Sequence, residues 1–195
     1  MIALWLALQT PPDLSEEVGA AWASRLSTLN EAQRFAEALA EGARYQERVG
    51  PNADVAYEMG LAANRSGDAA AALGWYDEAL RLRPKFAAAA YDRGELHLAA
   101  GRDEAAQADF EVAARARPDH WVGPFRLAQL AGRRADPTAF EEALLASVLR
   151  GFDLHTLALD PQWRAWAHDP NLGPILTRVI LVYGDEATLS ALRAP

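Results

Sequence analysis

Four histidines and a large set of carboxylates are the side chains of this 195-residue chain that could carry acid–base or metal chemistry. A metal site on a helix needs two ligands three or four residues apart, so that both reach one ion from the same face. None of the histidines has a partner at that spacing, and Asp153-x-His155 is too short a pattern for a catalytic dyad. We therefore expect no metal, no cofactor and no enzyme activity. The four histidines are His97, His120, His155 and His168.

Composition excludes several other classes of chemistry. The chain has no cysteine, which excludes disulfides, thiolate zinc sites and thiol nucleophiles. It contains no phosphate-binding loop, dinucleotide fingerprint or nucleophile elbow. A net charge of -8 argues against nucleic acid as a partner, because such binding relies on clustered basic side chains. No apolar run approaches the roughly 20 residues that a transmembrane helix needs, so we expect none.

Many positions in the middle of the chain recur with a period of about 34 residues. Small residues at fixed helical positions let two helices approach closely, and an aromatic ring one turn away fills the remaining space. Glycine suits a chain reversal, and proline ends a helix. The pattern therefore predicts helices over about 53–66, 69–82, 87–100 and 103–116. The recurring pairs are Gly60 and Gly94, Gly67 and Gly101, Ala72 and Ala106, Tyr76 and Phe110, Ala79 and Ala113, and Pro84 and Pro118.

This correlated set of residues, which occurs twice over 53–119, resembles the tetratricopeptide repeat family. The family's unit is a pair of antiparallel helices in about 34 residues. The resemblance implies an all-α, right-handed superhelical solenoid of helix pairs with a helical cap at each end. It also implies that the first helices of the pairs line a concave groove.

We divide the chain, predicted to be a single domain over 1–195, by this repeat. Residues 53–86 and 87–120 are repeats, and 121–151 is a degenerate one. In the degenerate repeat Gly132 comes early, and Pro137 opens a helix that continues through Arg150.

The two ends are predicted to be caps. Residues 13–52 form a helical hairpin, alternatively a degenerate repeat, whose second helix would be capped by Asn30-Glu31. Residues 152–195 form short helices begun by Asp-Pro pairs, with Trp163 and Trp166 packing on the last repeat. The apolar start Met1–Leu8 is expected to dock on the first repeat, or alternatively to be the remnant of a signal peptide.

Aromatic residues on the predicted first helices are the main functional candidates. Tyr57, Tyr91 and Phe125 recur with the same period, at a position that faces the groove in the resembled family. Such a row of rings could anchor an extended or helical peptide. Alternatively, the chain's own termini or a second copy fill the groove, and the rings are ordinary core. The other predicted groove residues are Leu61, Asn64, Arg65, Glu95 and Gln129.

The function predicted from these residues is that of a protein–protein interaction module, an adaptor or scaffold with a protein or peptide partner. The alternative is a structural or self-associating protein, for example a homodimer. We expect a cytoplasmic location, or an exported one if Met1–Leu8 is a signal remnant.

Overall fold

The structure is a computed structural model that describes residues 14–194, so the prediction for Met1–Leu8 lies outside the described residues. Across 14–194 the regular elements are helices, and no strand occurs. The predicted all-α class is therefore confirmed. The described residues form two compact units, which are divided between Leu96 and His97. The single domain and its division into repeats and caps stay predictions.

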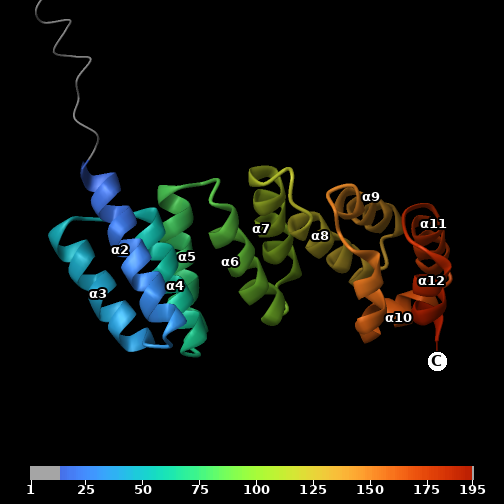
Figure 1. Cartoon of the computed structure of the whole chain (residues 1–195), viewed down its shortest axis with the longest axis horizontal. Coiled ribbons are helices and arrows are strands. Elements are labelled where there is room, and N and C mark those ends of the chain that lie inside the picture. Colours follow the sequence, from blue (N-terminus) through green and yellow to red (C-terminus); the bar gives the residue numbers. More distant parts are fainter. Residues whose placement is uncertain (1–13, 195) are drawn as a thin grey trace, which may run out of the picture. The chain divides into compact units, whose positions relative to one another are not determined.

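The N-terminal unit consists of successive antiparallel helices (Figure 1). The helices are α2 (Leu14–Glu31), α3 (Phe35–Arg48), α4 (Ala53–Arg65), α5 (Ala69–Leu82) and the first part of α6 (Ala87–Ala99). Both α3 and α4 pack against α2, and α4 packs most extensively against α5. The predicted hairpin over 13–52 is the pair α2–α3, and the predicted helices of the first repeat begin and end within one residue of their expected positions.

Gly60 and Tyr76 explain how α4 and α5 approach each other. A Cβ atom added at Gly60 would lie 2.6 Å from Cδ1 of Tyr76, so the ring occupies the space that a side chain would need. Tyr76 is fully buried. The complementary small residue and aromatic predicted from the repeat are therefore confirmed, and they fix the spacing of this helix pair.

Side-chain oxygens cap the helices of this unit. Oδ1 of Asn52 accepts the backbone N–H groups of Asp54 (2.9 Å) and Val55 (3.1 Å) at the start of α4. Oδ1 of Asp68 accepts the N–H of Ala71 (2.9 Å) at the start of α5. These bonds satisfy donors that a helix start leaves free, which explains where both helices begin.

The turns inside the helix pairs share one geometry, which recurs with the period of the repeat. Each contains a residue with positive φ followed by the paired backbone hydrogen bonds of a Schellman turn, in which the N–H of the next residue reaches back five positions. Glycine supplies this conformation in the two clear repeats, whereas glutamine and alanine adopt it in the outer pairs. The four residues are Gln33 (φ 58°), Gly67 (φ 90°), Gly101 (φ 68°) and Ala135 (φ 51°).

The turn at Gln33 corrects one prediction. Asn30 and Glu31 do not cap α3, because α2 continues through Glu31 and α3 begins at Phe35 after the N-cap residue Arg34. Asn30 lies inside α2 and is buried. Because no glycine is present, nothing in the sequence signals a reversal at Gln33. Asn30 was therefore wrongly interpreted as the cap of the next helix.

The C-terminal unit begins with helix pairs and ends with shorter helices (Figure 1). Its elements are the end of α6, α7 (Asp103–Ala116), α8 (Val122–Arg133), α9 (Pro137–Val148), η1 (Leu154–Leu159), α10 (Pro161–Ala167), α11 (Gly173–Tyr183) and α12 (Glu186–Arg193). Pro137 opens α9 after the N-cap Asp136, as predicted, while the reversal before it is made by Ala135 rather than Gly132. After the Gly151 turn, the segment from η1 to α12 supplies most of the buried residues of this unit's core.

Candidate functional site

Six of the eight predicted groove residues lie in the N-terminal unit, on the first helices α4 and α6. Positions 57, 61, 64 and 65 share one face of α4, because they are separated by three or four residues. Tyr57 and Leu61 are half-buried, whereas Asn64 and Arg65 are exposed. Tyr91 and Glu95 on α6 are half-buried. We call these six residues the first-helix face of the N-terminal unit.

Tyr57 connects α4 to α6 as well as lining this face. Its hydroxyl donates a hydrogen bond of 2.9 Å to Oδ2 of Asp92. Its ring centroid lies 5.0 Å from that of Phe86 and 6.0 Å from that of Tyr76. Burial and the neighbouring Asp92 carboxylate raise the pKa of Tyr57, so its hydroxyl stays protonated and remains a donor. Tyr57 therefore has a structural role in addition to any binding role.

Polar side chains that the sequence analysis did not predict connect this face to α2. Nδ2 of Asn30 donates to the backbone O of Glu58 (3.0 Å) and to its Oε2 (2.9 Å). Nη1 of Arg65 lies 3.4 Å from the backbone O of Asn30. Burial raises the pKa of both Glu58 and Asp92. These contacts join α2 to α4, and the Tyr57–Asp92 hydrogen bond joins α4 to α6.

A signal for the two carboxylates was present in the sequence. Glu58 directly follows Tyr57, and Asp92 directly follows Tyr91, so an aromatic–acid pair recurs in successive repeats. In the next repeat the residue after the aromatic is Arg126 instead. The recurrence of the charge, and not only of the ring, marks the two positions that share this environment.

The remaining two predicted residues, Phe125 and Gln129, lie in the C-terminal unit and pack inside it. The ring of Phe125 stacks on Phe152 (4.4 Å between centroids) and on Trp163 (5.4 Å), both from residues 152–194, which we call the C-terminal segment. Gln129 is buried, and its Oε1 accepts a hydrogen bond of 2.6 Å from Nη1 of Arg126. In this unit the chain's own C-terminal segment therefore covers the predicted aromatic, and Trp163 packs as core, as predicted.

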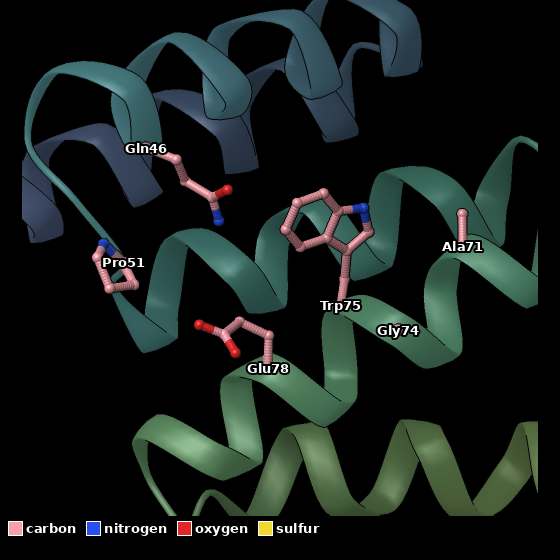
Figure 2. Close-up of a pocket in the computed structure, with 6 residues that line it drawn as sticks. All are labelled: Gln46, Pro51, Ala71, Gly74, Trp75 and Glu78. Carbon is pink, nitrogen blue, oxygen red and sulfur yellow. The ribbon is translucent and has the colours of Figure 1, made fainter.

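A hollow that was not predicted lies between the second helices α3 and α5. Figure 2 shows Gln46 reaching toward it from α3, and Trp75 and Glu78 from α5. The Glu78 carboxylate accepts two hydrogen bonds of 2.7 Å from Arg81, which lower its pKa. The equivalent residues two repeats later line a similar hollow in the C-terminal unit: Ala139, Glu142, Ala143 and Ala146. Because the hollow recurs with the repeat, helix-pair packing is sufficient to explain it.

The histidines do not assemble a site with other ligands. Nε2 of His97 lies 3.9 Å from Oδ2 of Asp109, and Nδ1 of His155 lies 2.5 Å from Oγ1 of Thr188. Within residues 14–194 no group of three or more histidine or acidic side chains could hold a metal ion. None of the helices in this range is long and apolar enough to cross a membrane.

Comparison with known proteins shows a similarity of fold. No family model matches the chain, and no curated protein does. The similar solved structures include the MamA RS-1 ArsTM double mutant (TM-score 0.63, 18% identity, 89% of each chain covered) and MamA 41-end from Desulfovibrio magneticus RS-1 (TM-score 0.63, 17% identity, 89% of this chain and 90% of that one). At such identity the likeness concerns the fold alone, and it confirms the predicted tetratricopeptide-like arrangement of helix pairs.

Proposed function

We propose that the first-helix face of the N-terminal unit binds a peptide segment of another protein, and that the chain is an interaction module rather than an enzyme. The observation that carries the proposal is the exposed pair Asn64 and Arg65 beside the half-buried Leu61 and Tyr57. Apolar surface rimmed by polar side chains is the usual composition of a peptide-binding surface.

The chemistry of this face favours a peptide over a small metabolite. The Arg65 guanidinium and the Asn64 amide can donate hydrogen bonds to peptide carbonyl or carboxylate oxygens. Leu61 and the edges of Tyr57 and Tyr91 offer apolar contacts for side chains of the peptide. The fold likeness supports an interaction module as a class, by analogy only.

The supporting contacts also suggest a rigid platform. Arg65 contacts the backbone oxygen of Asn30, the Asn30 side chain bonds to Glu58, and the Tyr57 hydroxyl bonds to Asp92. A preorganised surface binds at a lower entropic cost than a mobile one. The proposed site is confined to the N-terminal unit, because Phe125 of the other unit packs against Phe152 and Trp163.

The test uses exposed residues, because Tyr57→Ala would also remove the contacts of its ring and hydroxyl. A random peptide display library is panned against the immobilised full chain, and dissociation constants of enriched peptides are measured by fluorescence anisotropy. We expect Asn64→Ala/Arg65→Ala to weaken binding by at least about tenfold. Arg48→Ala, which removes another exposed arginine of the same unit, should change it by less than about twofold.

Two outcomes would contradict the proposal. Peptides that bind the double variant as tightly as the wild-type chain would place the site elsewhere. A library that yields no enriched peptide would argue against an extended peptide as the partner.

A further inference from the structure

Helix α11 of the C-terminal unit exposes large apolar side chains that no part of the described chain covers. Leu181 is 57% exposed and Val182 is 66% exposed. Scattered apolar side chains are ordinary on a protein surface, and Val18, Val49, Leu149 and Leu159 are examples here. Adjoining apolar residues beside a hollow are different, because they mark interaction surfaces.

The periodicity of α11 explains how the exposed side chains gather. Its buried face consists of Ile175, Leu176, Val179 and Ile180, which belong to the core of the unit. Positions 174, 178 and 181 fall on the opposite face at helical spacing, and position 182 lies at the border between that face and the buried one. The last turns of α11 are therefore apolar on both sides, a composition typical of a helix with partners on both faces.

A hollow adjoins this outer face, and residues of both α11 and α12 line it. Pro174, Thr177, Leu181 and Val182 line one side of it. Arg193 of α12 also lines it, and its Nη2 donates a hydrogen bond of 2.6 Å to Oγ1 of Thr177. We call these five residues the α11 patch.

Opposite charges line the same hollow. Among residues 16–194, whose side chains are described, no carboxylate forms an ion pair with Arg193. Arg178, by contrast, is paired with Glu141 at 2.6 Å. Asp169 also lines the hollow, and its Oδ1 accepts the N–H groups of Asn171 and Leu172. The hollow therefore presents one cation without a carboxylate partner and one anion, around apolar side chains.

We propose that the α11 patch binds a second copy of this chain in a two-fold symmetric contact. A two-fold axis brings the same surface of both copies together. A cation and an anion at different places on that surface can then each meet the opposite charge of the other copy. Leu181 and Val182 of each copy would pack against each other, and Arg193 of each copy would meet Asp169 of the other. A partner of uniformly negative charge would pair with Arg193 but be repelled by Asp169, whereas a second copy satisfies both.

The molar mass of the full chain in solution tests this proposal, independently of peptide binding. Light scattering after size exclusion is recorded from about 1 to about 200 µM, a range that covers dimers of moderate affinity. We expect the mass to rise from 21.2 kDa toward twice that value with concentration. In Leu181→Asp/Val182→Asp, buried charges should raise the dissociation constant at least about a hundredfold. Arg193→Glu, which would face Asp169 with a like charge, should raise it about tenfold.

A matched control distinguishes the patch from general apolar exposure. Leu149 is 70% exposed in the same unit, so Leu149→Asp should dimerise like the wild-type chain. Circular dichroism is used to check that each variant keeps its helices. A mass that stays at 21.2 kDa throughout the range would overturn the proposal and indicate that another protein covers α11. Unchanged dimerisation of the double variant would overturn it too.

Discussion

Asp92 is a half-buried carboxylate whose environment opposes its charge. Burial raises its pKa, while the hydrogen bond from Tyr57 and the charge of Arg65 act in the other direction. Burial is the largest of these influences, so the folded chain holds the Asp92 proton more tightly than the unfolded chain. Stability that depends on this proton is present in acid and is lost as the pH rises through the folded pKa.

Asp92→Asn should remove this pH dependence while keeping an oxygen that accepts the Tyr57 hydroxyl. The free energy of unfolding, measured by urea denaturation from about pH 4 to pH 7, should fall more steeply with pH in the wild-type chain than in the variant. At pH 7 the variant should be at least as stable. Glu58, whose pKa burial also raises, is present in both chains and does not affect the difference. A difference that stays constant with pH would show that burial does not govern this carboxylate.

Prediction from sequence was weakest for the packing of individual side chains. Tyr57 and Tyr91 were identified because aromatic residues stand out at the period of the repeat, yet the burial of Tyr57 against Phe86 depends on tertiary packing. Phe125 has the same spacing but packs against Trp163, which lies outside the predicted repeats. Periodicity therefore predicts equivalent backbone positions, and the neighbours of each ring depend on segments that the period does not describe.

At the scale of helices, the repeat pattern correctly predicted those helix pairs whose ends are marked by glycine and proline. The ends of α4, α5, α6 and α7 lie within one residue of the predicted bounds. In the outer pairs the same Schellman turns are made by Gln33 and Ala135, which carry no turn signal. The backbone bonds of the turn are the same, so this geometry forms at both positions without the glycine that favours it.

This comparison predicts that glycine at the outer turns stabilises the chain. A residue other than glycine in the left-handed region costs roughly 1–2 kcal/mol, and added freedom of the unfolded glycine offsets part of the gain. Gln33→Gly and Ala135→Gly should each raise the free energy of unfolding by about 0.5–1 kcal/mol in thermal or urea denaturation. Gly67→Ala and Gly101→Ala are the reverse controls and should lower it by about 1 kcal/mol. If Gln33→Gly and Ala135→Gly were destabilising, the left-handed turns would not be strained.

At the scale of the whole molecule, the helix pair α8–α9 shares its core with a segment outside the predicted repeats. A helix pair in a stack leaves one side of its apolar surface without a neighbour, so terminal pairs need a different cover. Phe140 and Leu144 of α9 share a core with Phe152, Trp163 and the buried face of α11. Trp163 is fully buried and contacts Phe125, Phe140 and Trp166, so it joins both parts of this core.

Trp163→Ala should therefore destabilise the helix pair as well as the segment that contains Trp163. Loss of a buried aromatic side chain costs about 3–5 kcal/mol, and amide exchange followed by mass spectrometry should be faster in α8 and α9 as well as in α10 and α11. Trp163→Phe retains a ring and removes an indole N–H that has no hydrogen-bond partner, so it should cost only about 1 kcal/mol. Exchange that accelerated in α10 and α11 alone would mean that α8 and α9 are stable without the C-terminal segment.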